Sequence, residues 1–80
     1  MMLKNITVEK FVRALERDGF VLKRKEGSHR TYKNLETGRR VTISYHHSGD
    51  TIRTGTLNSL IIDAGWTEND LIRLKLMRKG

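Results

Sequence analysis

Apolar residues in the first part of the chain recur with the spacing of an amphipathic helix. The four that define it are Val8, Phe11, Val12 and Leu15. This spacing of i, i+3, i+4 and i+7 places them on one helical face and predicts a helix over residues 7–18. Thr7 is the expected N-cap, because its hydroxyl can accept a hydrogen bond from a free backbone N–H. Gly19 follows the last turn, where a left-handed residue commonly ends a helix.

The next part of the chain has the pattern of short strands. The three predicted strands cover residues 20–25, 28–35 and 39–45. In the third, Val41, Ile43 and Tyr45 alternate with polar residues, as in a strand with one buried face. Short turns that contain Gly27 and Gly38 separate the strands. Because such short turns join antiparallel neighbours, the pattern predicts a three-stranded antiparallel meander.

Helical spacing returns after a polar loop. The residues that carry it are Leu57, Leu60, Ile61 and Ala64. They predict a second helix over about residues 55–64. Thr54 or Thr56 is the expected N-cap of this helix, and Gly65 is placed to end it.

A third helix is predicted to begin at Thr67, where Asp70 stands in the capping-box position. Its apolar residues reach as far as Met77. The element order is then α-β-β-β-α-α, which is also the order of double-stranded RNA-binding domains. We expect an α+β fold of two layers, in which the helices cover one face of the sheet and leave the other open. The 80 residues are expected to form one domain over residues 1–80, with a core at about residues 7–77.

Composition excludes several classes of protein. The chain has no Cys, so it can form neither a disulfide nor a Cys-ligated zinc site. Its longest apolar runs are about three residues, whereas a bilayer-spanning helix needs ~20. The N-terminus also lacks the apolar region of a secretory signal. We therefore expect a cytoplasmic protein without a membrane partner.

Positive charge is concentrated in one segment. The chain has 16 Lys and Arg against 9 Asp and Glu, a net charge of +7. Residues 23–40 hold seven of the basic residues and only two acidic ones, a net charge of +5 in 18 residues. Solubility alone would explain a uniform distribution, but this concentration favours an anionic partner, with nucleic acid first.

His29 is the histidine with the most chemical context. It follows the turn at Gly27 and begins the second predicted strand, inside the basic segment. In a regular strand it shares a face with Thr31 and Lys33, while Tyr32 points to the core. A histidine exchanges protons near neutral pH. Most histidines are surface or hydrogen-bonded residues, so position alone does not establish catalysis.

A base among clustered cations fits the cleavage of RNA. RNA carries its own nucleophile, the 2′-hydroxyl, so the site needs only a base for its proton and cations for the charge that grows on phosphorus. No metal or other cofactor is required, and the carboxylates of Glu26, Glu36 and Asp50 are isolated in sequence. His46 and His47 are adjacent, and neighbours on a strand point to opposite faces, so we expect no metal site there.

Two glycine-containing segments have both structural and functional explanations. Gly27 permits a positive φ and Ser28 is common in turns, which accounts for both residues structurally. Alternatively, Gly27 lets a backbone approach closely and Ser28 donates to a phosphate. Residues 54–56 offer the same choice between simple capping and holding an anion at a helix start.

Residues 27–32, Gly-Ser-His-Arg-Thr-Tyr, resemble a family signature. The signature is the Gly-Ser-His-x-x-aromatic motif of the HicA toxins, also called the YcfA-like family. Other segments resemble this family in the same order. They are residues 15–20, 40–47, 55–61 and 64–66. The resemblance covers about residues 8–74, so it rests on far more than one tripeptide.

The resemblance implies a fold, an activity and a partner. HicA proteins have a double-stranded RNA-binding-like fold and are toxins of type II toxin–antitoxin pairs. They cleave mRNA without a metal through the His of the motif, and a HicB antitoxin neutralises them by covering that site. Carried over, the catalytic residue is His29, with Gly27 and Ser28 beside it. Many members have Pro before the loop His, whereas His47 here follows His46.

The sequence thus predicts a metal-independent endoribonuclease toxin with mRNA as substrate and a HicB-like antitoxin as partner. Residues expected to contact RNA besides His29 are Gly27, Ser28, Lys23, Lys25, Lys33, Arg39, Arg40 and His47. The alternative is a non-catalytic RNA-binding module that uses the same basic face. A DNA-binding helix-turn-helix over residues 54–77 is a weaker alternative, because that part of the chain has little net charge.

Overall fold

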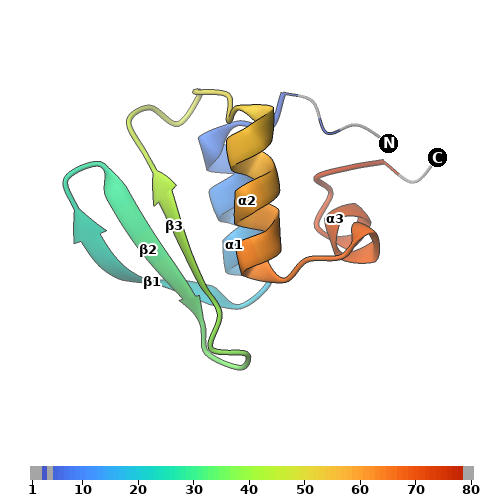
Figure 1. Cartoon of the computed structure of the whole chain (residues 1–80), viewed down its shortest axis with the longest axis horizontal. Coiled ribbons are helices and arrows are strands. Elements are labelled where there is room, and N and C mark those ends of the chain that lie inside the picture. The colour runs from blue at the N-terminus through green and yellow to red at the C-terminus, as the bar shows by residue number, and fades with distance from the viewer. Residues whose placement is uncertain (1–2, 4, 79–80) are drawn as a thin grey trace.

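The computed structural model describes residues 3 and 5–78 and shows a sheet covered by helices on one face (Figure 1). Its elements are α1 (Val8–Arg17), β1 (Phe20–Glu26), β2 (His29–Asn34), β3 (Arg40–Ser44), α2 (Thr54–Ala64) and α3 (Glu68–Arg73). The strands form one antiparallel sheet in the order β1-β2-β3. The predicted α+β fold and its α-β-β-β-α-α order are therefore confirmed.

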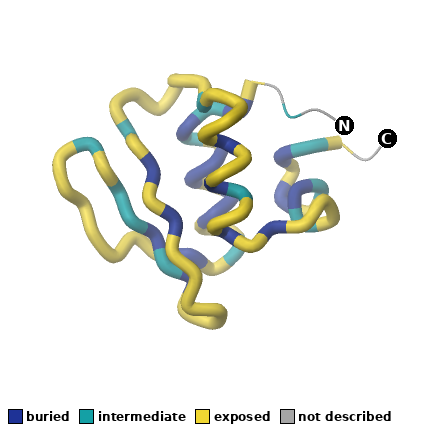
Figure 2. The backbone as a smooth tube through the Cα atoms, viewed as in Figure 1, coloured by how far each residue is buried: buried dark blue, intermediate teal, exposed yellow. Residues whose placement is uncertain are grey.

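The core lies between the helices and one sheet face (Figure 2). All four apolar residues that predicted the first helix are buried. From the sheet, Tyr32 and Val41 point into the same core. Thr7 is the N-cap of α1 as predicted, since its hydroxyl accepts a bond of 3.1 Å from the backbone N–H of Lys10. Gly19 has the positive φ expected after the helix.

A β-bulge interrupts the pairing of β1 with β2. Leu22 lies opposite Tyr32, but the next pair is Arg24 with Thr31, so Lys23 is the extra residue. Since a bulge inserts one residue, the side chains that follow it change face relative to a regular strand. Arg24 therefore shares the open face of the sheet with Thr31.

The start of α2 differs from the prediction. Arg53, not Thr54 or Thr56, is the N-cap, and no side chain caps the helix. The segment before it is held extended by backbone bonds to the start of α1. Ile52 donates to the carbonyl of Ile6 at 2.9 Å, and this pairing directs the chain into the helix at Thr54.

The end of α2 agrees with the prediction. Gly65 has a φ of +75°, the left-handed conformation that glycine adopts at low cost. Its N–H donates to the carbonyl of Ile62, and the N–H of Trp66 donates to that of Ile61. These two bonds are those of a Schellman motif, and they return Trp66 to the core.

The third helix is shorter than the apolar pattern suggested. Its capping box between Thr67 and Asp70 is present. The helix ends at Arg73, and both Leu74 and Leu76 are buried. Two residues along a helix differ in direction by about 200°, so a continuing helix could not bury both.

Asp18 ties the end of α1 to α3. One of its carboxylate oxygens accepts from the indole N–H of Trp66 at 2.7 Å, and the other accepts from Arg73 at 2.8 Å. Arg73 also donates to Asp70 at 3.1 Å. The backbone N–H of Thr67, followed by Arg73, lowers the pKa of Asp70 below its usual value of 3.8. The C-terminal segment is thus fixed to the core by charged hydrogen bonds.

Candidate functional site

His29 begins β2, the central strand, and lies on the open face of the sheet. Its register partners are Glu26 on β1 and Ser44 on β3. Residues that face each other across neighbouring strands share a sheet face. Thr31 and Lys33 continue the same face along β2, because successive side chains alternate. The side chain of His29 is exposed, as a proton donor or acceptor for a bound ligand must be.

The turn before His29 fixes the start of the strand. Gly27 has a φ of +57°, and no neighbouring atom would obstruct a Cβ there, so the backbone conformation is what requires glycine. The carbonyl of Ser28 accepts a bond of 2.6 Å from the N–H of Tyr45. The guanidinium of Arg30 lies 3.9 Å above the ring of Tyr45. These contacts hold the start of β2 against the end of β3, beside His29.

Four cations gather in a cleft on the open face, which we call the basic cleft. It has a volume of about 370 Å³ and is lined by Lys23, Arg24, Thr31, Lys33, Arg40 and Thr42. The hydroxyls of Thr31 and Thr42 are 3.0 Å apart across the strands. Thr31 is two residues from His29, a distance of ~7 Å along an extended strand. The cleft thus offers positive charge and hydroxyl groups on the face that carries His29.

The structure separates the predicted cations into two sets. Lys23, Lys33 and Arg40 line the basic cleft. Lys25 does not, because it pairs with Arg30 in the register after the bulge, on the face opposite to His29. Arg24 was missed by sequence analysis, since strand alternation without a bulge assigns it to the helical side.

Arg39 lies away from the basic cleft. It lines a different hollow with Asp18, Trp66 and Asp70. Its guanidinium lies against Gly65, where an added Cβ would meet Arg39 atoms at less than 3 Å. Arg39 is exposed, and its side chain lies across the end of α2 rather than on the open face of the sheet.

A third hollow, the edge cavity, lies along the free edge of β3. Its volume is about 590 Å³, and its polar wall is made by Thr42, Ser44, His46, Asp50, Thr51, Arg53 and Thr56. Thr42 lines both the edge cavity and the basic cleft. His46 is therefore the loop histidine beside this part of the sheet, whereas His47 is exposed and lines none of the hollows described here. Sequence analysis had assigned RNA contact to His47, whereas the loop histidine that lines the edge cavity is His46.

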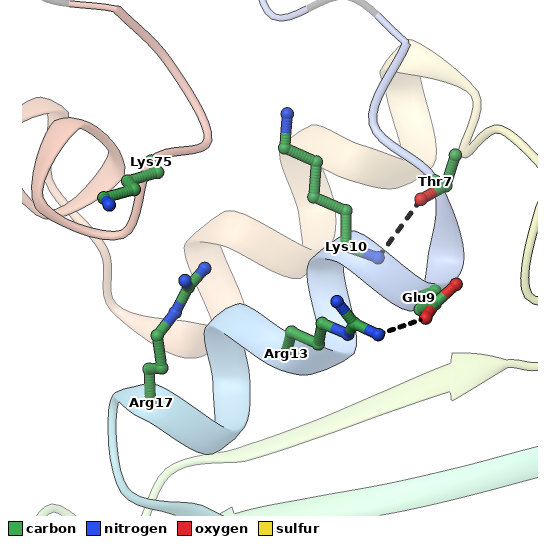
Figure 3. A pocket seen from close by; sticks show the side chains of 6 residues that line it. All are labelled: Thr7, Glu9, Lys10, Arg13, Arg17 and Lys75. Atoms are coloured by element: carbon green, nitrogen blue, oxygen red, sulfur yellow. Dashed lines mark hydrogen bonds and ion pairs between the residues drawn. The ribbon is translucent and has the colours of Figure 1, made fainter.

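A second cluster of cations lies on the helical layer, in a hollow that we call the α1 groove (Figure 3). Its basic residues are Lys10, Arg13, Arg17 and Lys75. Arg13 pairs with Glu9 at 2.6 Å, and Arg17 donates to the carbonyl of Leu74 at 2.9 Å. The spacing of Lys10, Arg13 and Arg17 along one helical face could have revealed this cluster in the sequence.

The described part of the chain contains neither a metal-binding cluster nor a membrane-spanning helix. Within residues 3 and 5–78, no three His, Asp or Glu side chains form a group that could hold a metal ion. In the same residues, no helix is long and apolar enough to cross a membrane.

Comparison with known proteins adds one finding. A family model described as the HicA toxin of bacterial toxin–antitoxin systems matches residues 8–66. The match includes α1, all three strands and α2, and it ends at Trp66. No curated protein matches the chain.

Proposed function

The chain belongs to the HicA toxin family, and on this premise we propose that it is a metal-independent endoribonuclease that cleaves mRNA. Family membership makes it the toxin of a bacterial toxin–antitoxin pair, with an antitoxin as its partner. In the proposal, His29 is the general acid or base, and a HicB-like antitoxin inhibits the toxin by covering this face. Residues 1–80 are proposed to act as a single cytoplasmic domain.

The observation that carries the proposal is the position of His29 on the same sheet face as the basic cleft. Lys and Arg side chains neutralise phosphates and supply most of the sequence-independent affinity for nucleic acid. A histidine at the margin of such a cleft can reach the sugar of a bound nucleotide. Phosphate binding alone would not need this titratable group.

The proposed reaction is a transesterification within RNA. The imidazole of His29 removes the proton of a 2′-hydroxyl, whose oxygen attacks the adjacent phosphorus. Cations of the basic cleft stabilise the negative charge that grows on the phosphoryl oxygens. The bond from phosphorus to the 5′-oxygen breaks, that oxygen takes up a proton from water, and the imidazolium of His29 returns its proton to the solvent. The products are a 2′,3′-cyclic phosphate and a 5′-hydroxyl.

The test compares wild type with His29→Ala on single-stranded mRNA in excess EDTA. We expect wild type to cleave and to leave cyclic phosphate ends, and the variant to lose at least ~100-fold in rate, as for removal of a general base. Circular dichroism of both proteins checks that the variant folds. Equal cleavage by the variant would refute the role of His29. Loss of wild-type cleavage in EDTA would refute the metal-independent mechanism.

The alternative is a non-catalytic RNA-binding module. It is favoured by one observation, which is that His29 does not line the basic cleft. This alternative predicts RNA affinity that falls steeply with salt, is unchanged in His29→Ala, and is accompanied by no cleavage.

The antitoxin should complement the charge of this face. Because the toxin has a net charge of +7, we expect the contact surface of the antitoxin to be acidic. Protection of β2 and β3 amides from hydrogen exchange on antitoxin binding would support this placement.

A further inference from the structure

We propose that the edge cavity is a nucleobase pocket that selects the base next to the cleaved phosphate, with preference for bases that carry an amino group. This inference rests on the proposed function, since it assumes that the ligand of the open face is single-stranded RNA. It assigns Asp50 as a specificity-determining residue.

The edge cavity and the basic cleft differ in chemistry. The lining of the cleft combines four cations with two threonine hydroxyls and includes no carboxylate, although Arg24 pairs with Glu26 beside it at 2.9 Å. The edge cavity has one carboxylate, Asp50, and one guanidinium, Arg53, and its remaining wall includes the apolar side chains of Val8, Ile43 and Ile52. A carboxylate repels phosphate, whereas apolar contacts and single polar groups suit a flat heterocycle. The cleft therefore fits the backbone of RNA, and the edge cavity fits a base.

The two hollows are adjacent on the molecule. Thr42 lines both of them. Ser44, also in the edge cavity, is the register partner of His29. Facing residues on antiparallel strands have Cα atoms ~5 Å apart. A base in the cavity thus belongs to a nucleotide beside the one whose 2′-hydroxyl is near His29.

The polar wall of the cavity offers both stacking and hydrogen bonding. Bases of single-stranded RNA stack on planar groups such as imidazole and guanidinium, which His46 and Arg53 supply. The carboxylate of Asp50 can only accept hydrogen bonds when ionised. An acceptor discriminates in favour of adenine, cytosine and guanine, whose amino groups donate, and against uracil, which has no amino group and whose one edge donor, N3–H, lies between two carbonyls that repel a carboxylate.

The backbone around Asp50 is fixed before any ligand binds. Its N–H donates to the carbonyl of His47 at 3.1 Å, and its own carbonyl accepts from Val8 at 2.8 Å. The salt bridges among the described residues do not use its carboxylate. Asp50 is thus held in place by its main chain while its side chain remains available to a base.

The experiment selects RNA by equilibrium binding and sequences what is bound. Protein carrying His29→Ala is incubated with a random single-stranded RNA library, so that no RNA is consumed by cleavage. We expect one position of the bound RNA to be enriched in amino bases over uracil. Asp50→Asn should lower this ratio about tenfold, since one polar base contact is worth ~1–3 kcal/mol of discrimination. The matched control is Asp63→Asn, which makes the same change of charge on an exposed residue of α2.

The outcomes separate this inference from the proposed function. Enrichment that is equal in Asp50→Asn and the control, or absent in the parent protein, overturns the nucleobase pocket. The proposed function is tested separately, by the cleavage assay. RNA cleavage can be absent while the selection still shows a base preference, and cleavage can be present while the selection shows no base preference. Asp50→Ala removes the same carboxylate and should lower the base preference in the same way, which keeps the test decisive if Asp50→Asn does not fold.

Discussion

The basic cleft predicts how RNA affinity responds to salt. Each phosphate neutralised on a single strand contributes about −0.7 to the slope of log affinity against log salt. If the four cations of the cleft each neutralise one phosphate, the slope is about −2.8. Removing two of them by Lys33→Gln and Arg40→Gln should reduce it to about −1.4. Between ~50 and ~200 mM salt, affinity should then fall ~50-fold for the parent but only ~7-fold for the double variant.

Fluorescence anisotropy of a labelled single-stranded RNA measures these slopes, with His29→Ala in every protein so that the RNA stays intact. The control is Lys10→Gln with Lys75→Gln, which removes the same charge from the α1 groove. Its slope should equal that of the parent. If both double variants flatten the slope equally, net charge and not the basic cleft governs binding, and the assignment of this face is refuted.

Three further predictions concern the fold that supports the site. Gly65→Ala should lower the free energy of unfolding by at least ~1–2 kcal/mol, because φ at this residue is +75° and the guanidinium of Arg39 must move to admit a Cβ. Urea denaturation measures this change, and an unchanged midpoint would contradict it. Thr67→Ala should cost about 1 kcal/mol through loss of the capping box, seen as a lower melting temperature. The pKa of Asp70 is lowered in the folded protein, so ionised Asp70 stabilises the fold at pH values above the pKa of the unfolded state, and this stabilisation is lost as pH falls through the pKa of the folded state. Asp70→Asn should therefore lose less stability than wild type between pH 6 and about pH 2 in thermal melts. Parallel plots of melting temperature against pH for the two proteins would refute this.

Periodicity and local capping signals in the sequence were sufficient for the main elements, for the N-caps of α1 and α3 and for the glycine that ends α2, but not for the N-cap of α2. The apolar face of α1 and the glycine after α2 are local signals, and the structure confirms both. The motif at Gly27 likewise predicted a turn from which β2 begins. These features depend on residues that are close together in the sequence, which is why they can be recognised without tertiary structure.

Other features depend on contacts that the sequence does not display. Nothing in the sequence around Lys23 departs from the alternation of a regular strand. Lys23 forms a bulge only because it has no register partner on β2, and this extra residue turns Arg24 to the open face. Likewise, α3 stops at Arg73 because the two leucines after it both reach the core. The edge cavity is formed by β3, a loop, the start of α2 and the first residue of α1. Its residues are spread over 49 positions, from Val8 to Thr56, with no common pattern.

The pairing of Lys33 with Arg40 has a consequence for the free toxin. The two residues face each other on β2 and β3, and like charges in that arrangement destabilise a sheet. Added salt screens this repulsion, so the melting temperature of the free protein should rise with ionic strength. RNA binding weakens over the same range. The stability of the fold and its affinity for RNA thus respond to salt in opposite directions. The repulsion between Lys33 and Arg40 is greatest at the low ionic strength at which RNA binds most tightly.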